Sequence, residues 1–124
     1  MMWRITSEDV RYVKKNKFTG PYVKTPFQET DSQYQPWDKL YLDIVGPLPM
    51  TEEGYKYILT SQDNLSKYLL ATPMITQTAD EVALTFLRYE ILYYGIPNSI
   101  VTYQGSHFCV IFLNGYVNYL RYLS

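Results

Sequence analysis

The sequence predicts an α/β domain of the α+β type, with a group of strands before its one clear helix. Three apolar, β-prone runs come first, at residues 39–46, 55–62 and 67–74. A helical repeat begins at Thr78, and a fourth short strand is expected at residues 99–102. The element order is therefore β-β-β-α-β. With 124 residues, 47% of them hydrophobic, the chain is long enough to bury a core.

The first three runs read as strands with short connections. "KLYLDIVG" is interrupted by a single acid, Asp43. "YKYILTSQ" and "KYLLATPM" are separated by the short polar loop "DNLS", which favours a hairpin. Asp63 opens this loop, and turn aspartates commonly hydrogen-bond backbone groups close to themselves. We therefore expect Asp63 to have a structural role.

The helix has start and stop signals. Residues 78–81 form a capping box, in which Thr78 is the N-cap and Glu81 the third helical residue. Apolar residues recur at helical spacing: Ala79, Val82, Ala83, Phe86 and Leu87. Gly95 and Pro97 predict the helix end. Glu90 falls within the apolar stripe, so its carboxyl group needs a partner or solvent.

Residues 109–120 fit two structures. "CVIFL" and "YVNYL" are β-prone runs around Asn114-Gly115, a dipeptide typical of hairpin turns. Leu113, Val117 and Leu120 nevertheless keep a helical spacing. Taken alone, the residues leave helix and hairpin open.

The N-terminal third is basic and then proline-rich. Residues 10–24 contain five Lys or Arg side chains and no acid, with three aromatic side chains interleaved. This composition is expected for nucleic-acid contact, with Lys14, Lys15 and Lys17 as candidate contacts. A solvated basic helix or linker would look the same. Residues 18–38, with three prolines, predict an extended connector.

Composition and patterning exclude several classes of protein. One cysteine, Cys109, cannot form an internal disulfide. The first residues lack the apolar core of a secretory signal, and no run approaches the ~18 apolar residues of a membrane span. The formal net charge of −1 suits a globular chain, which we expect to be intracellular.

Several linked motifs carry a family resemblance. The stretch "PWDKLYLDIVGPLPMTEEGYKYILTSQDNLSKYLLATPMITQTADEVA", followed by "YGIPNSIVTYQGSHF", closely resembles the integrase catalytic core of gypsy-type LTR retrotransposons. "VRYVKKNKFTGPYVKTPFQ" looks like the segment that joins the family's zinc-binding module to this core. The resemblance implies two parts: residues 1–35, a remnant of the zinc-binding module and linker, and residues 36–124, a partial catalytic core.

The resemblance also implies a fold. It is the RNase H-like fold, a mixed sheet with flanking helices, here C-terminally truncated. Three antiparallel strands should lead, and the strand at residues 99–102 should lie parallel to the first and beside it. The family places a helix after this strand, so we predict a helix over residues 107–121 rather than a hairpin. Gly115 should weaken that helix by about 1 kcal/mol relative to alanine.

The family's activity is DNA strand transfer and 3′-end processing at two Mg²⁺ ions held by an Asp-Asp-Glu set. By position, Asp43 matches the first acid and Tyr103 stands where the second would be. A phenol is a neutral, poor Mg²⁺ ligand at pH 7, and we do not expect Tyr103 to act as a nucleophile. No Asp or Glu follows Tyr103. Glu90 lies on the earlier helix and cannot replace the third acid. We expect weak Mg²⁺ binding at best and no catalysis.

This chain lacks zinc ligands at the positions that match the zinc-binding module of the family. Its Cys-x-x-Cys pair would fall where this chain has Val10 and Val13, and the only histidine, His107, lies in the core segment. Structural zinc needs four ligands of this type. The sequence therefore predicts no zinc site.

The resemblance finally implies partners and a location. Candidate nucleic-acid contacts in the core are Lys67, Gln104, Ser106 and His107, the last two at a possible helix start. DNA is the expected partner, a homo-oligomer is possible by resemblance, and the nucleus is the expected site for an integrase-like protein. Two alternatives to an inactive integrase fragment stay open: a non-enzymatic nucleic-acid-binding chain, and a decayed reading frame with no selected function.

Overall fold

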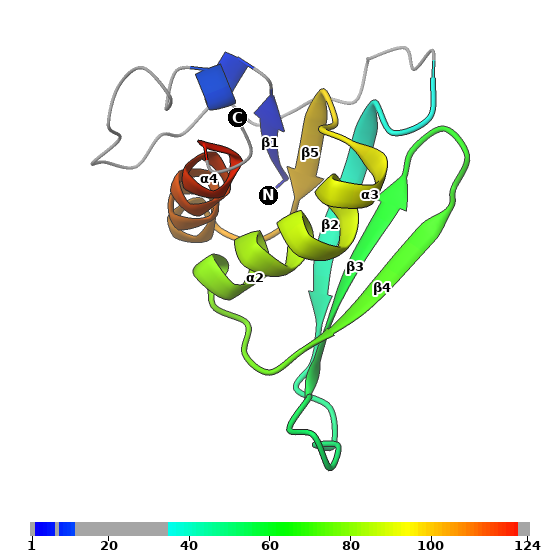
Figure 1. The fold of residues 1–124 in the computed structure, drawn as a ribbon, viewed down its shortest axis with the longest axis vertical. Helices are drawn as coiled ribbons and strands as arrows, with labels where there is room; N and C mark the ends of the chain where they lie inside the picture. The colour runs from blue at the N-terminus through cyan, green and yellow to red at the C-terminus, as the bar shows by residue number, and fades with distance from the viewer. Residues whose placement is uncertain (1, 7, 12–34, 122–124) are drawn as a thin grey trace.

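The computed structural model describes residues 2–6, 8–11 and 35–121, which form one mixed sheet with helices on one of its faces (Figure 1). The strands are β1 (Trp3–Thr6), β2 (Lys39–Val45), β3 (Tyr57–Asp63), β4 (Leu69–Met74) and β5 (Ser99–Thr102). The helices are α2 (Ala79–Phe86), a π-helical turn η1 (Leu87–Ile91), α3 (Leu92–Tyr94) and α4 (Ser106–Arg121). Residues 8–11 form one further helical turn.

The strand order is β1-β5-β2-β3-β4. β2, β3 and β4 form an antiparallel meander, and β5 lies parallel to β2 beside it. These relations confirm the predicted topology and the α+β class, which is compatible with an RNase H-like fold. β1 was not anticipated: it pairs antiparallel with β5 and forms an edge of the same sheet. The division of the chain near residue 35 stays a prediction.

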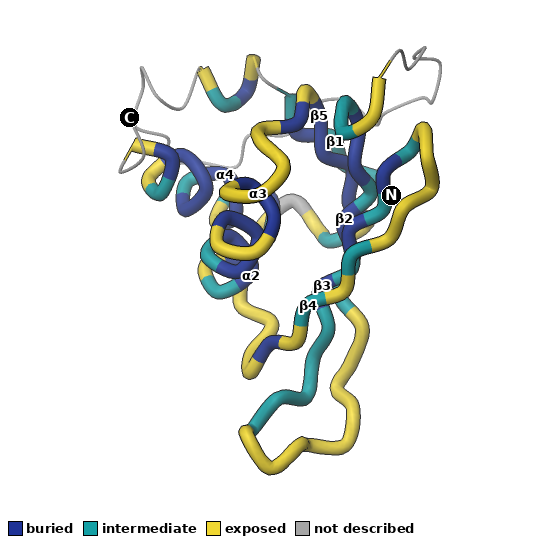
Figure 2. The backbone as a smooth tube through the Cα atoms, turned by 45° about the vertical axis from the view of Figure 1, so that its right-hand side comes forward, coloured by how far each residue is buried: buried dark blue, intermediate teal, exposed yellow. Residues whose placement is uncertain are grey.

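The core lies between the sheet and the helices α2 and α4 (Figures 1 and 2). Strand side chains alternate between faces, so Leu42, Leu59 and Ile100 are all buried against the helices. Phe86 is the largest fully buried side chain of α2, and its ring centroid lies 6.0 Å from that of Phe112. Burying one side chain of this size contributes about 1.5–3 kcal/mol, so this shared core holds the layers together.

The predicted helix signals operate as expected at both ends. The Thr78 hydroxyl accepts a hydrogen bond from the Glu81 backbone N–H at 3.3 Å. Gly95 ends the helical segment with φ of 92°, a conformation that favours glycine. Between these ends the helix widens into η1, and this π-helical turn contains Glu90. The sequence pattern did not predict the change of helix type.

α4 confirms the predicted helix over residues 107–121, against the hairpin signal of Asn114-Gly115. The cause is tertiary packing, because the residues on both sides of that dipeptide are buried against the sheet and α2. A Cβ at Gly115 would lie 3.3 Å from the Cβ of Ala83 and 3.2 Å from Asp80 Oδ1. Gly115 therefore lets α4 approach α2 closely, at a small intrinsic cost to the helix.

Asp63 has the structural role predicted for it, and its carboxylate bonds Trp37, which is distant in sequence, as well as its own turn. One carboxylate oxygen accepts the Trp37 backbone N–H at 2.9 Å, and the other accepts the N–H and hydroxyl of Ser66 at 2.9 and 2.6 Å. Burial alone would raise the pKa of Asp63, but these hydrogen bonds outweigh it and hold the pKa below its ordinary value. Trp37 in turn donates through Nε1 to the Gly95 carbonyl at 2.7 Å.

Some predicted features lie outside the described residues. They include Val13 and the basic side chains Lys14, Lys15 and Lys17. Val10, by contrast, is described and packs against the core. Among the described residues, none of the helices has the length and apolar character needed to cross a bilayer.

Candidate functional site

The candidate site is the place where the parallel pairing of β2 with β5 finishes, while β2 itself continues to Val45 beside β3. The two strands pair in register, and the last Cα pair is Leu42 with Thr102. The residue that follows Leu42 in β2 is Asp43, and the residue that follows Thr102 at the end of β5 is Tyr103. Parallel strands deliver such residues to the same edge, which is where α/β proteins commonly hold ligands. The structure therefore brings together the two positions that the sequence analysis paired.

Asp43 presents its carboxylate to solvent. Its side chain is exposed, and Oδ1 accepts only a local hydrogen bond, from the Ile44 N–H at 2.8 Å. The Asp43 carbonyl accepts a bond from the Thr60 hydroxyl at 3.2 Å, which fixes the backbone against β3. Asp43 is thus held in place by its backbone, and its carboxylate is available to a ligand.

Tyr103 also faces solvent, with 62% of its surface exposed. It begins a short turn in which the Gln104 N–H donates to the Thr102 hydroxyl at 3.2 Å. α4 starts directly afterwards, and the Cys109 N–H donates to the Gly105 carbonyl at 3.1 Å. Gln104 and the exposed His107 therefore lie at the same sheet end as Asp43. Ser106 is the first residue of α4.

Lys67 lies elsewhere. It belongs to the β3–β4 turn, where its N–H donates to the Asp63 carbonyl at 2.9 Å. Asp63 pairs with Leu40, near the start of β2, so this turn is at the opposite end of the sheet from Asp43. The Lys67 ammonium is 3.4 Å from the Asn64 side-chain oxygen. Lys67 is therefore separated from the other core candidates, which sequence order alone does not reveal.

The residues present do not fit a pair of metal ions. Within the described ranges, no three His, Cys, Asp or Glu side chains are grouped so that they could hold a metal ion. Glu90 cannot join Asp43, because it hydrogen-bonds Ser61 on the face of the sheet that α2 and η1 cover. Asp43 follows Leu42 of that face by one residue, so its side chain points to the other side.

Glu90 is nevertheless an unusual carboxyl group. It is 1% exposed, and its Oε2 accepts the Ser61 hydroxyl at 2.9 Å. Its Oε1 is buried and has no hydrogen-bond partner among the residues that the structure describes. Burial raises the pKa of Glu90 to about 7, and the Ser61 bond only partly opposes this. The sequence predicted the need for a partner but missed Ser61. The available signal was a serine two residues after the apolar Leu59, on the same face of β3.

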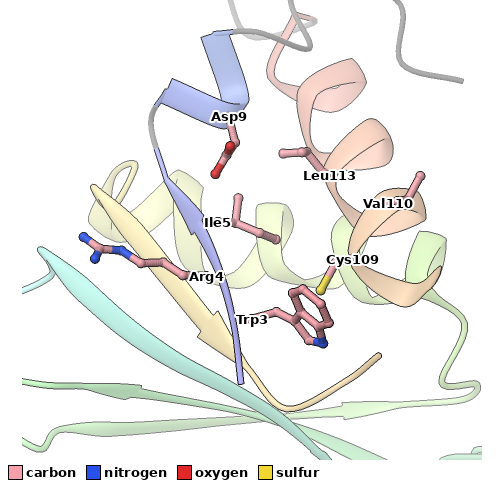
Figure 3. A pocket seen from close by; sticks show the side chains of 7 residues that line it. All are labelled: Trp3, Arg4, Ile5, Asp9, Cys109, Val110 and Leu113. Atoms are coloured by element: carbon pink, nitrogen blue, oxygen red, sulfur yellow. The ribbon is translucent and has the colours of Figure 1, made fainter. Parts of the chain in front are cut away.

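The cavity between β1 and α4 is too small for a ligand (Figure 3). Its volume is about 20 Å³, and it is lined by Trp3, Ile5 and Cys109 among others. A space of this size holds about one water molecule. Burial raises the pKa of the Cys109 thiol to about 11, so this cysteine is not poised to react.

Fold and site together define a class. The antiparallel meander β2-β3-β4, the helical segment that follows it and β5 parallel to β2 define an α+β domain that is compatible with an RNase H-like fold. No family model matches the chain. Comparison with known proteins nevertheless gives consistent relatives.

The chain is 31% identical over 97 residues to the retrovirus-related Pol polyprotein from transposon 412 of Drosophila melanogaster, covering 78% of this chain and 8% of that protein. It is 24% identical over 86 residues to gypsy retrotransposon integrase-like protein 1 of Homo sapiens, covering 69% of this chain and 16% of that protein. The Mus musculus protein of the same name is 23% identical over 86 residues. The chain therefore spans a small part of these relatives. The similarities support an integrase-like, gypsy-type origin, as the motifs predict.

Proposed function

We propose that this chain is an integrase-type catalytic-core fragment that binds DNA and is catalytically inactive as it stands. One observation carries the proposal. The parallel pairing of β2 with β5 ends at Leu42 and Thr102, so the next residues along the two strands are Asp43 and Tyr103, and the resemblance implies a second metal-binding acid at the position of Tyr103.

The chemistry explains why this replacement abolishes activity. Attack on a phosphodiester needs an activated oxygen and relief of charge on the leaving oxygen, and two divalent ions about 3.5–4 Å apart supply both. Mg²⁺ takes oxygen ligands in near-octahedral geometry, and two adjacent cations need several carboxylates to offset their repulsion. Asp43 supplies one carboxylate, and residues 104–124 contain no acid. This set of residues cannot assemble the family's two-ion site.

Nucleic-acid binding does not need the metal site. Gln104 and the exposed His107 follow β5 in the chain, and both can hydrogen-bond phosphate oxygens. The basic residues Lys14, Lys15 and Lys17 add charge that would release counterions from DNA. This binding should be weak, salt-dependent and without sequence preference. A nuclear location follows if the chain acts on chromosomal DNA.

The test is to restore the missing carboxylate and measure metal binding and catalysis separately. We expect Tyr103→Asp to tighten Mn²⁺ binding several-fold, while Tyr103→Asn, of the same size but uncharged, should not. Neither variant should perform strand transfer or 3′-end processing on a labelled oligonucleotide, because residues 104–124 supply no carboxylate for the third position. Metal-dependent strand transfer by the unmodified chain would refute the inactive assignment.

DNA binding by the same proteins separates the remaining alternatives. Retained, salt-sensitive binding without catalysis supports the proposal and also a purely DNA-binding role. Replacing Lys14, Lys15 and Lys17 with glutamine should lower the salt dependence of the binding constant, with a log–log slope smaller by up to about 3. Absence of DNA binding at low salt would leave the decayed reading frame as the better account.

A further inference from the structure

β4 forms an uncovered edge of the sheet. It is the last strand in the order β1-β5-β2-β3-β4, and its sequence, "LLATPM", has no charged side chain. Natural edge strands usually carry charges, bulges or prolines that discourage pairing with another chain. β4 has only Pro73. Leu69, Ala71 and Pro73 are all exposed, so the face of this strand that the helices do not cover is open to solvent.

The hydrogen bonds to β3 show which backbone groups of β4 remain available. The Asp63 N–H donates to the Tyr68 carbonyl at 2.9 Å, and the Lys56 N–H donates to the Met74 carbonyl at 3.2 Å. Antiparallel strands alternate between residues that bond the neighbour and residues that point away. Even-numbered residues of β4 therefore bond β3, and Leu69, Ala71 and Pro73 direct their backbone groups outward. In the part of the chain that the structure describes, no other segment hydrogen-bonds to this edge.

The outward pattern is complementary to itself. In an antiparallel pair of β4 strands centred on Ala71, this residue faces Ala71 of the second copy, and the two exchange a pair of N–H to carbonyl bonds. Leu69 faces Pro73 of the second copy, so its N–H donates to the Pro73 carbonyl, once in each direction. Pro73 lacks an N–H, and the two reverse bonds are lost. Four bonds are formed around one two-fold axis.

The side chains allow the same arrangement. Lys67 would face Ile75, so no like charges are placed opposite each other. Leu69, 56% exposed in the single chain, would pack beside the exposed Pro73 of the second copy. On the other face, an open cleft of about 420 Å³ between β4 and the α2–η1 helix leaves room for the helix-facing side chains of an added strand.

We propose that a second copy of this chain docks on the β4 edge, forming a two-fold dimer with one continuous sheet. The inference is independent of the proposed function, because it uses no residue of the Asp43 end. A second copy is the occupant that the edge favours, since the N–H and carbonyl of Ala71, the N–H of Leu69 and the carbonyl of Pro73 all find partners in the two-fold image.

Two substitutions on the outward positions should have opposite effects on dimerisation of the full chain. Ala71→Pro removes the central outward N–H and both central bonds, and it leaves the bonds to β3 in place. Pro73→Val adds the missing N–H. By sedimentation velocity, we expect Ala71→Pro to raise the dimer dissociation constant at least about tenfold and Pro73→Val to lower it several-fold. A chain that stays monomeric at all concentrations, or whose dimer responds to neither change, overturns the proposal.

A crosslink tests the register even if Ala71→Pro fails to fold. Directly paired residues of antiparallel strands have Cα atoms about 5.5 Å apart, within disulfide range. Ala71→Cys should therefore form an intermolecular disulfide under mild oxidation. Leu69→Cys is the matched control, because residue 69 lies four positions from its own image. Equal crosslinking of the two variants would refute the proposed pairing.

Discussion

The two ends of the sheet carry two aspartates in opposite circumstances. Asp63, at the end where β3 finishes, is 2% exposed and accepts bonds from Trp37 and Ser66. Asp43, at the other end, is exposed and accepts one local N–H. At the first end, the Asp63 carboxylate joins Trp37 to the β3–β4 turn. At the second end, bonds to the Asp43 backbone, including that from the Thr60 hydroxyl, hold the residue in position. The difference separates a carboxylate that serves the fold from one that is free to serve a ligand.

Removing each acid should give the largest contrast in stability. Asp63→Ala leaves the Trp37 and Ser66 donors without their acceptor, so we expect the free energy of unfolding to fall by about 4 kcal/mol. Asp43→Ala should change it by less than about 0.5 kcal/mol. Urea denaturation at pH 7 measures both. Equal losses would break the comparison.

The Asp63 contribution also has a definite pH dependence. Its folded pKa lies below the ordinary value of 3.8, so its stabilisation is complete above that pH. The stabilisation is lost as the pH falls through the lower folded pKa. Asp63→Asn, which keeps the shape but removes the charge, should abolish this acid-dependent part.

Glu90 extends the comparison. It is as buried as Asp63, but its carboxyl group accepts a hydrogen bond from Ser61, whereas Asp63 accepts from both Trp37 and Ser66. Its folded pKa of about 7 lies above the ordinary value of 4.5, so folding favours the protonated form. The free energy of unfolding should therefore decrease as the pH rises from about 4.5 to about 7, by roughly 3 kcal/mol, and then level off. Glu90→Gln should flatten this part of the profile, and Glu52→Gln, in an exposed loop, should not. An unchanged profile in Glu90→Gln would contradict the burial argument.

Substitutions at Gly115 test the packing between α2 and α4 without changing the charge of the chain. They have the smallest expected effect on stability. Gly115→Val should destabilise the chain by about 2 kcal/mol, because its side chain meets Ala83 across the α2–α4 contact. Gly115→Ala is the matched control: its gain in helix propensity of about 1 kcal/mol opposes the tight contact, so the net change should be small. Thermal unfolding of both variants gives the comparison. A valine variant as stable as the alanine variant would show that the helices can separate freely.

Much of this architecture could be predicted from residue patterns. Alternating apolar runs located β2, β3 and β4, and the Thr78 capping box with Gly95 located the helical segment, because these signals are local. The parallel placement of β5 came from the resemblance, and so did the pairing of Asp43 with Tyr103. The choice of helix for α4 also needed it, since the residues around Gly115 suit both structures.

The features that could not be predicted depend on tertiary contacts. β1 has four residues, and nothing in "WRIT" indicates a partner near residue 100. The Ser61–Glu90 bond joins a strand to a helix, and the separation of Lys67 from His107 depends on strand direction. To predict any of these features, one must first know which elements are neighbours in the fold.

The attachment of β1 has a consequence for the order of assembly. Ile5 pairs with Ile100, so this contact closes a loop that includes most of the chain. The β2–β4 meander, by contrast, joins strands that are close in sequence and loses little chain entropy when it forms. Contacts at long sequence separation stabilise a folding chain only after that entropy has been lost. We therefore expect the meander to form before the β1–β5 pairing, with β1 the last strand to join the sheet.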